Sequence, residues 1–429
     1  MSPGSRTAVV AVAIALAVPA LAPPSPAAAD WGPVTVLAAN TRGESLAVDG
    51  RAAVTVVWAT PGTAGPGDVI ARQRTAGGDW RAPVVIGHGY APQVVVDRRG
   101  DVTAVWLTQE RGRTDGVEAA RSPAGGRWSD PVRLSRDLEA PTYRPGAEDV
   151  YGAAQLDVAV GPRGVVAAAW AWGSVDRDQP WRVQAVWRHR HGGWVRPAEV
   201  TPANWSSAPQ VGVAADGTTV VAWGRQPFGR PQALRARQHD GSGWSAAETV
   251  AREGYAPDLA VDRAGDAVLV FRTASSRVDA AVMSAGGPWQ RAEHLSPRGV
   301  EVDDAALAMN ARGSAVVAMG RYAGRVDLVE RPPGGAWGPP ARVVRSRTSV
   351  YDVLVALDSA GDTFLGWGGY ALQGKYRPAG GDWGVRSTIS PDAGAEVLET
   401  AYAAIAPDGT VAVLWKQEER PLKVRVRSQ

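Results

Sequence analysis

The sequence predicts an all-β fold built from repeated four-stranded units, and three observations lead to this prediction. A glycine followed six positions later by a bulky apolar residue recurs along the chain, and its last five positions are 48 residues apart. A second motif, Gly-Gly-x-Trp or a near variant, follows it in most repeats. No stretch of ten or more residues shows the 3.6-residue apolar period of an amphipathic helix.

The two motifs define eight repeats, numbered 1 to 8 below. The first motif occurs at Ala52/Trp58 (with alanine in the glycine position), Gly100/Trp106, Gly164/Trp170, Gly217/Trp223, Gly265/Phe271, Gly313/Met319, Gly361/Trp367 and Gly409/Trp415. The second motif ends at Trp80, Trp128, Trp194, Trp244, Trp289, Trp337 and Trp383. Repeats of 45–50 residues are typical of architectures that stack one supersecondary unit on the next.

Each repeat has the pattern of four short antiparallel strands. In repeat 2 the alternation of apolar residues predicts strands over 93–97, 101–107, 116–121 and 128–134, with turns at the glycines between them. Four-stranded units of this length, repeated around a ring, are the blades of a β-propeller. The eight repeats therefore predict an eight-bladed propeller, with seven blades as the alternative, and an open solenoid of sheets as a different architecture for the same pattern.

The two ends of the chain indicate how such a ring closes. Repeat 8 ends at Gln429 without the second motif, whereas an unpaired Trp31 near the start is followed by Gly-Pro-Val-Thr-Val-Leu. The same kind of continuation follows Trp80 and Trp128. We therefore expect the N-terminal strand to be the fourth strand of repeat 8, which leaves few free strand edges.

Residues 1–29 have the features of a secretory signal peptide. Arg6 precedes an apolar stretch over 8–22 that is too short to span a bilayer, and Ala27-Ala28-Ala29 provides small residues before Asp30. An N-terminal membrane anchor is the alternative. We expect residues 30–429 to form a single secreted, extracellular domain without membrane association.

Composition excludes several classes of function. The 429 residues contain no cysteine, which removes thiol catalysis and thiolate metal sites, and a domain this large can bury enough core without disulfides. The formal net charge of +3 is too small to predict nucleic-acid binding, and the arginines are spread along the sequence without forming a run. We expect no metal and no cofactor; the pair His189-x-His191 is the only chelating pattern, and it precedes a glycine turn.

The turn Gly125-Gly126-Arg127-Trp128 resembles a degenerate Asp-box turn of the sialidase-type propellers. Asp240-Gly241-Ser242-Gly243-Trp244 is nearest to the full motif. The resemblance implies a secreted bacterial propeller in which these turns are structural and face away from the active site. A hydrolase of that family would also carry a Phe/Tyr-Arg-Ile-Pro motif near its N-terminus. The nearest match, Tyr143-Arg144-Pro145, lacks the isoleucine and lies between repeats 2 and 3.

Candidate ligand-binding residues lie where the repeats differ. The turns between strands two and three and the links between repeats carry the insertions, above all 135–152 and 173–181, and strand-one starts converge on the central channel. The candidates combine aromatic rings with charged groups, which suits sugar binding by stacking and hydrogen bonds. They are Tyr90, Tyr143, Arg144, Asp149, Tyr151, Trp181, Trp205, Tyr255, Asp303, Tyr351 and Glu399.

These features predict a secreted, monomeric, non-catalytic module that binds a polysaccharide or other glycan. The sequence contains no complete catalytic motif, so we expect a binding module rather than an enzyme. One alternative is a diverged glycoside hydrolase or lyase that uses two carboxylates. The candidate carboxylates are those on the face that carries the turns between strands two and three and the links between repeats: Asp149, Asp303, Asp304, Asp352 and Glu399. The other alternative is a cell-envelope scaffold whose partner is a protein.

Overall fold

The structure is a computed structural model, and every secondary-structure element in its described residues is a β-strand. The described residues are 31–62, 66–110, 113–135, 156–172, 181–190, 192–202, 204–227, 229–350, 352–369, 371–391, 398–417 and 420–428. The predicted signal peptide lies outside these ranges. Within them, no helix is long and apolar enough to cross a membrane.

The strands form seven antiparallel sheets, six of four strands and one of seven. The seven-stranded sheet contains β2 (Glu44–Val48), β3 (Val54–Ala59), β4 (Gly67–Arg74), β5 (Val84–Val96), β6 (Val102–Glu110), β7 (Arg113–Ser122) and β8 (Val132–Arg133). Repeat 3 forms β9 (Leu156–Val160), β10 (Val166–Trp172), β11 (Arg182–Arg188) and β12 (Ala198–Glu199). Repeat 4 forms β13 (Ser206–Val213), β14 (Thr219–Arg225), β15 (Ala233–His239) and β16 (Glu248–Ala251).

The remaining four sheets follow the same order from inner to outer strand. Repeat 5 forms β17 (Tyr255–Val261), β18 (Ala267–Arg272), β19 (Val278–Met283) and β20 (Glu293–His294). Repeat 6 forms β21 (Asp304–Met309), β22 (Ala315–Arg321), β23 (Arg325–Arg331) and β24 (Ala341–Arg345). Repeat 7 forms β25 (Val353–Leu357), β26 (Thr363–Trp367), β27 (Gln373–Arg377) and β28 (Ser387–Thr388). Repeat 8 forms β29 (Leu398–Ile405), β30 (Val411–Gln417) and β31 (Leu422–Arg427), and β1 (Thr35–Ala38) completes its sheet.

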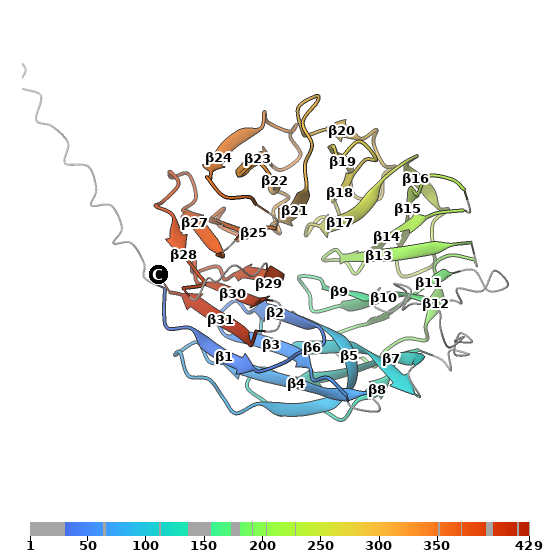
Figure 1. The fold of residues 1–429 in the computed structure, drawn as a ribbon. Coiled ribbons are helices and arrows are strands. Elements are labelled where there is room, and N and C mark those ends of the chain that lie inside the picture. The colour runs from blue at the N-terminus through green and yellow to red at the C-terminus, as the bar shows by residue number, and fades with distance from the viewer. Residues whose placement is uncertain are drawn as a thin grey trace, which may run out of the picture.

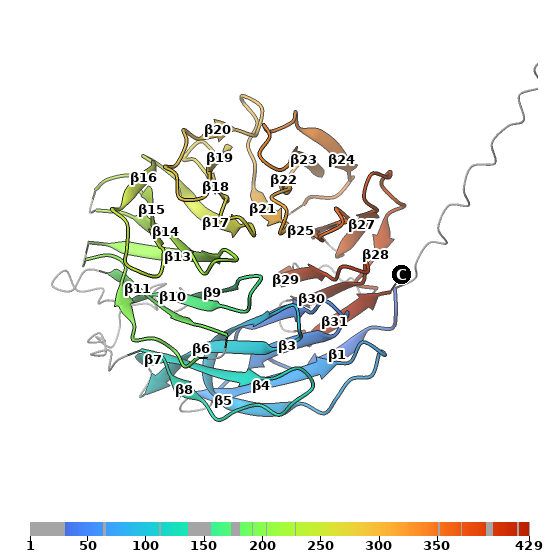
Figure 2. The ribbon, with the colours of Figure 1, turned by 180° about the vertical axis from the view of Figure 1, so that it is seen from behind.

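The sheets are arranged around a central axis as in a β-propeller, and the first strand of each repeat lies nearest the middle (Figure 1). The view from behind shows the same ring (Figure 2). The inner strands contact one another in turn around the axis, in the order β2, β5, β9, β13, β17, β21, β25 and β29, and β29 contacts β2. The predicted all-β class and the four-stranded antiparallel units are therefore confirmed.

Repeats 1 and 2 share one sheet because β5 continues from one repeat into the next. Its first half pairs with β4 (Gly67 opposite Gly89), and its second half pairs with β6 (Tyr90 opposite Leu107). The segment Val84–Val96 is rich in β-branched residues, which favour an extended backbone. The sheet count is thus seven, although eight sequence repeats contribute strands.

The predicted strands of repeat 2 are correct in order but not in length. The first is observed as the second half of β5, the second as β6 and the third as β7. The fourth is much shorter than predicted, because β8 contains only Val132 and Arg133. The segment around Trp128 instead runs alongside β7 with single hydrogen bonds, such as Ser129 N–H to Arg121 O at 2.8 Å.

The chain ends meet in the sheet of repeat 8. Strand β1 pairs antiparallel with β31, with Thr35 opposite Val424, and Trp31 forms an isolated bridge with Arg427. The Gly32 N–H donates to the Val426 carbonyl at 2.9 Å. The Trp31 ring packs edge-on against Phe364 of the neighbouring sheet, with centroids 6.0 Å apart.

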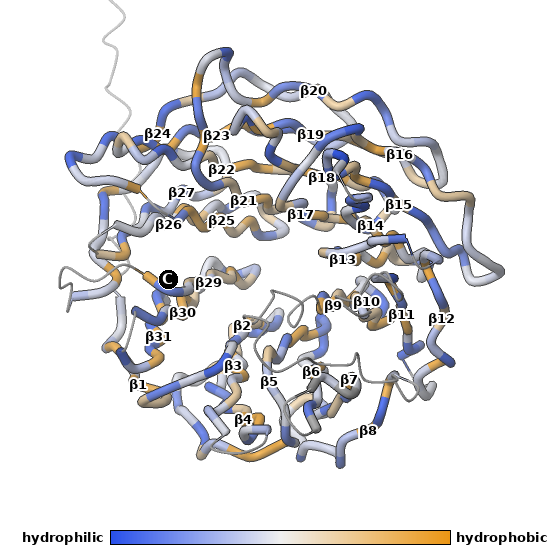
Figure 3. Tube along the Cα trace, turned by 45° about the vertical axis from the view of Figure 1, so that its right-hand side comes forward, coloured by the Kyte–Doolittle hydropathy of each residue, from blue (hydrophilic) through white to orange (hydrophobic). Residues whose placement is uncertain are grey.

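The hydrophobic core lies between neighbouring sheets, and the tryptophans of the first motif fill it. Trp170, for example, clusters with Val105 and Leu107 of the preceding sheet, and Trp223 with Val165 and Ala167. Hydrophobic stretches fall within the strands and hydrophilic ones in the connections (Figure 3). Burying an aromatic ring against the next sheet provides the contact that holds one unit to another.

The turns between strands one and two explain the recurring glycine and aspartate. Gly100 has a φ of +89°, a conformation that other L-residues rarely adopt. The Asp97 carboxylate accepts hydrogen bonds from the N–H groups of Arg99 and Asp101, at 2.9 and 3.0 Å. Since the aspartate side chain satisfies the turn's backbone, the residues between Asp97 and Gly100 are free to vary without disturbing the turn.

Candidate functional site

The structure describes six of the eleven predicted site residues. Tyr143, Arg144, Asp149, Tyr151 and Tyr351 lie outside the described residues, so their roles stay predictions. The six described residues are Tyr90, Trp181, Trp205, Tyr255, Asp303 and Glu399.

Tyr90 is a buried residue of the inner strand β5. Only 7% of its surface is exposed, its hydroxyl bonds to Thr114, and the Arg42 guanidinium lies 5.4 Å from its ring centroid. Tyr255 begins β17 and is half-buried opposite Arg272 of β18. Tyr90 is therefore part of the core between the first two repeats, whereas the side chain of Tyr255 is partly exposed to solvent.

Trp181 and Trp205 are brought together by the backbone. The Trp181 carbonyl accepts hydrogen bonds from the N–H groups of Asn204 and Ser206, at 3.2 and 2.9 Å. Trp205 has a φ of +64°, which is strained for a bulky residue, and both rings are half-buried. The backbone segments that carry these two residues therefore lie side by side.

Asp303 and Glu399 are exposed carboxylates with protein partners. Asp303 accepts a hydrogen bond from the Tyr322 N–H. Glu399 forms an ion pair with the buried Lys416 at 2.8 Å, and Lys416 also donates to the Thr41 carbonyl at 3.3 Å. Glu399 thus belongs to a polar network that joins repeat 8 to repeat 1.

Three carboxylates on the inner strands, with a fourth directly before the inner strand β25, form a series that the predictions included only in part. Asp157, Asp258 and Asp304 accept hydrogen bonds from backbone N–H groups of the next inner strand, at 2.7 Å (Val211), 2.9 Å (Leu307) and 2.8 Å (Val353). Asp352 continues the series in repeat 7. The sequence signal was a lone aspartate within an apolar strand, as in Leu156-Asp157-Val158.

Burial raises the pKa of these carboxyls, and neighbouring negative charges raise it further. The pKa of Asp157 rises to about 7, with Asp258 as the like charge, and the pKa of Asp258 rises to about 6, with Asp304 as the like charge. The pKa of Asp352 rises to about 6 for the same two reasons, and that of Asp304 is also raised by burial. Asp157, Asp258 and Asp352 can therefore exchange protons closer to neutral pH than ordinary surface carboxyls do.

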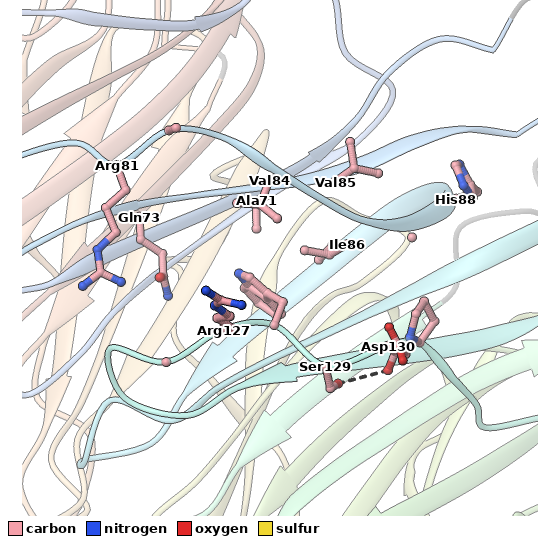
Figure 4. A pocket seen from close by; sticks show the side chains of 15 residues that line it. Ala71, Gln73, Arg81, Val84, Val85, Ile86, His88, Arg127, Ser129 and Asp130 are labelled. Carbon is pink, nitrogen blue, oxygen red and sulfur yellow. Dashed lines mark hydrogen bonds between the residues drawn. The ribbon is translucent and has the colours of Figure 1, made fainter.

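A groove of about 820 Å³ lies at the outer edge between repeats 1 and 2 (Figure 4). The first half of β5 and the segment 126–131 line it. Figure 4 shows Arg81 and Gln73 towards one end, His88 and Asp130 towards the other, and apolar side chains between them. The half-buried Trp128 also lines the groove, and Val84 and Val85 are 47% and 53% exposed.

Two further cavities lie at turns, the first in repeats 1 and 2 and the second across repeats 2 to 4. One of about 240 Å³ is lined by Arg51, Arg74, Arg81 and Arg99 together with Asp49. The other, of about 690 Å³, is lined by Arg98, Arg99, Arg163 and Arg190 together with Asp97, His189 and Asp216. The arginines are spread along the sequence, and we expected no patch of them. This expectation is wrong, because the turns of successive repeats bring several arginines together on one face of the folded protein. None of the described predicted site residues lines any of these three cavities.

The groove has the chemistry of a sugar-binding site more than that of a catalytic or metal site. An indole face with aliphatic neighbours can stack on a pyranose ring, while guanidinium, imidazole, amide and hydroxyl groups can bond its hydroxyls. Among the described residues, no group of three or more His, Asp or Glu side chains is placed to hold a metal ion. None of the four carboxyls Asp157, Asp258, Asp304 and Asp352 lines the groove.

Comparison with known proteins identifies the fold. No protein-family model matches the chain, and no curated protein is similar enough to match it. Among solved structures, the chain is similar to the BP39L lectin from Burkholderia pseudomallei, with a TM-score of 0.54 and 13% identity over 82% of this chain and 99% of the lectin. At this identity the similarity establishes a shared fold.

Two weaker similarities are to the polysaccharide lyase Uly1 and to the Aleuria aurantia lectin in complex with alpha-methyl-L-fucoside. The lyase gives a TM-score of 0.47 at 8% identity, over 78% of this chain and 89% of that one. The Aleuria aurantia lectin gives 0.42 at 10% identity, over 83% of this chain and 97% of that one.

Proposed function

We propose that this protein is a secreted β-propeller that binds carbohydrate without transforming it. The observation that carries the proposal is the groove between repeats 1 and 2, where Trp128 and the exposed Val84 and Val85 lie among hydrogen-bonding side chains. Such a surface offers a stacking platform and polar groups at fixed positions, which is the combination a sugar ring requires. The fold shared with the BP39L lectin supports the same conclusion.

We infer that the propeller has eight blades closed by the N-terminal strand. Eight inner strands contact one another in cyclic order, and the two halves of β5 serve two different sets of partners, so the seven-stranded sheet divides into two blades. The pairing of β1 with β31 supplies the fourth strand that repeat 8 lacks.

We also propose that residues 1–29 are a signal peptide that is removed before Asp30. Mass spectrometry of the secreted protein tests this cleavage.

A glycan array followed by titration with the polysaccharides it identifies tests carbohydrate binding. Trp128→Ala is expected to weaken binding at least about tenfold, because it removes the only indole that lines the groove in the described residues. Trp337→Ala is the matched control, since Trp337 occupies the same motif position in repeat 6 and likewise packs half-buried against a core cluster. Equal loss in both variants, or no binding by the wild type to any glycan, would contradict the proposal.

A second candidate, a diverged glycoside hydrolase or lyase of the sialidase-like propeller type, is favoured by one observation. Burial and the like charge of Asp304 raise the pKa of Asp352 to about 6, which suits a general acid. Incubation with a panel of glycosides and polysaccharides distinguishes the two candidates. Turnover that is lost in Asp352→Asn would favour the enzyme; an inert wild type that binds glycans favours the binding module.

A further inference from the structure

The three cavities form one continuous track across repeats 1 to 4. Gln73 and Arg81 line both the outer groove and the cavity of about 240 Å³. Arg99 lines both that cavity and the next one, of about 690 Å³. A ligand that entered the groove could therefore extend over the turns without leaving the surface, which a linear polymer can do and a single small ion cannot.

The track carries a positive charge that the overall composition conceals. Its lining contains eight arginines and four aspartates, which leaves an excess of four positive charges with the histidines neutral. The whole chain has a formal charge of only +3, so the rest of the protein is slightly negative. Such a local concentration of charge attracts anions to one place on the surface.

The guanidinium groups of the track have no close carboxylate partner among the described residues, although Asp79 interacts with Arg74 and Asp101 with Arg190 at longer range. Within the described ranges, none of the eight forms an ion pair or donates a hydrogen bond. Three of the four aspartates are engaged by their own turns: Asp49 accepts from the N–H groups of Arg51 and Ala53, Asp97 likewise from Arg99 and Asp101, and Asp216 from that of Thr218. The positive charge is therefore not neutralised where it gathers.

Arg190 adds a buried Nε–H donor that a ligand could use, a feature that it shares with six other arginines of the described residues. It is only half-exposed at the far end of the track, and its Nε is buried without a hydrogen-bond acceptor in the described residues. A buried unsatisfied donor on a charged group is costly, and an anionic oxygen would relieve that cost. Beside it, burial and the like charge of Arg121 lower the pKa of Arg188, as expected where positive charge is in excess.

The turn itself does not require these arginines. The position before the turn glycine, or before the Ala52 that replaces it, is occupied by Arg51, Arg99, Arg163, Asp216, Ala264, Arg312, Ala360 and Asp408 in repeats 1 to 8. Three consecutive repeats carry arginine and repeat 6 carries Arg312, whereas the same turn in the other four repeats is formed with aspartate or alanine. The choice of arginine in repeats 1 to 3 therefore needs a reason other than folding.

We propose that the track binds an acidic polysaccharide, with carboxylate or sulfate groups of the sugar chain held by the arginines of repeats 1 to 3. This proposal rests on the carbohydrate binding proposed above and names its ligand class. Guanidinium groups bind carboxylate and sulfate oxygens with two parallel hydrogen bonds, which gives both affinity and orientation. A single-stranded nucleic acid fits less well, because Trp128 is the only large aromatic residue in the lining and successive bases need successive stacking platforms.

Titration of the purified protein with alginate, heparin, dextran and a single-stranded oligothymidylate tests the proposal. We expect alginate or heparin to bind, dextran to bind at least about tenfold more weakly, and the affinity to fall as sodium chloride rises from about 50 to 200 mM. Arg99→Glu is expected to weaken anionic binding about tenfold or more, because Arg99 lines two cavities. Arg163→Glu should act in the same direction.

Arg312→Glu is the matched control. Arg312 holds the same exposed turn position in repeat 6, and its N–H donates to Asn310 as that of Arg99 donates to Asp97. Its affinity should stay within about twofold of wild type. Equal effects of both substitutions, or dextran binding as strong as alginate binding, would overturn the acidic ligand but leave carbohydrate binding intact. Tightest binding to the oligonucleotide, or no polysaccharide binding at all, would overturn both proposals.

Discussion

Strands of different repeats contact each other around the central axis and again at the chain ends. The two regions differ in how many residues provide these contacts. Around the axis, a side chain on one inner strand accepts a hydrogen bond from the next: Asp258 from Leu307, and Ser45 from Val94, both 49 residues apart. At the chain ends, the four-residue strand β1 and the side chain of Arg425 connect the N-terminal segment to the sheet of repeat 8. The first arrangement distributes stability over many small contributions, whereas the second depends on a few residues.

Arg425 makes several of the contacts that connect the two chain ends. Its guanidinium donates to the carbonyls of Gly32 at 2.7 Å, Thr388 at 3.0 Å and Ile389 at 3.2 Å. It also lies 5.9 Å from the Trp31 ring centroid. One side chain on β31 thus binds both the N-terminal segment and the neighbouring sheet, and its contacts with Gly32 and Trp31 exist only when both chain ends are in place.

Deletion of residues 30–38 should have the largest effect on stability. It uncovers Leu422 and Val424, which are fully buried, and leaves β31 as an unpaired edge. Burial of each such side chain is worth about 1.5–3 kcal/mol, so we expect a loss of about 4 kcal/mol or more in the free energy of unfolding. Chemical denaturation of chains 30–429 and 39–429 measures it.

A synthetic peptide of residues 30–40 provides the control for this deletion. If the N-terminal strand completes the last sheet, the peptide added to the shortened chain should restore part of the melting temperature in a concentration-dependent way. An unchanged melting temperature in the shortened chain would contradict the role given to β1.

An intermediate effect is expected where an inner-strand acceptor is removed. Asp258→Ala leaves the Leu307 N–H without a partner inside the protein, which should cost about 1–3 kcal/mol. Asp258→Asn keeps a carbonyl oxygen at the same place and should cost less. Equal destabilisation by the two variants would show that the charge, and not the acceptor, matters at this junction.

The sequence predicts this architecture well because the constraint is periodic. A turn glycine and a core tryptophan every 48 residues are needed wherever a sheet packs on the next, so Gly361 and Trp367 occur for the same reason as Gly409 and Trp415. The continuation of β5 through two repeats was not predictable in this way, since the spacing between repeats 1 and 2 is also 48.

The candidate site was harder to predict because it depends on what adjacent turns place side by side. Arg51, Arg99 and Arg163 are 48 and 64 residues apart in the sequence, and no local run of charge signals that they line successive cavities. We predicted the site on the face that carries the insertions. The arginines lie on the other face, where the turns of the repeats are nearly uniform in length. Comparing the same turn position across all repeats would have found them.

The pH dependence of stability sharpens the contrast between charged and neutral inner-strand acceptors. The pKa of Asp157 is about 7 in the folded protein, against an ordinary value of 3.8 that applies when unfolded. The folded state therefore binds this proton more tightly, so the contribution to stability is complete below pH 4 and is lost as pH rises from about 4 to 7.

Asp157→Asn should remove this part of the pH dependence. The amide keeps an acceptor for the Val211 N–H but cannot ionise. We expect the variant to be more stable than wild type at pH 8 by about 1–2 kcal/mol, because residual solvent access screens the full effect, and closer to it at pH 4. Melting curves across this range measure the difference; parallel curves for the two proteins would contradict the raised pKa.

Ser45→Ala should give the smallest effect and the clearest contrast with Asp157. The Ser45 hydroxyl accepts from the Val94 N–H at 3.2 Å, so its removal should cost about 1 kcal/mol. Because a hydroxyl does not titrate in this range, the cost should be the same at pH 5 and pH 8. A cost that changed with pH would mean that the Ser45 junction is coupled to the buried carboxyls elsewhere on the inner strands, and that the junctions around the axis do not act independently.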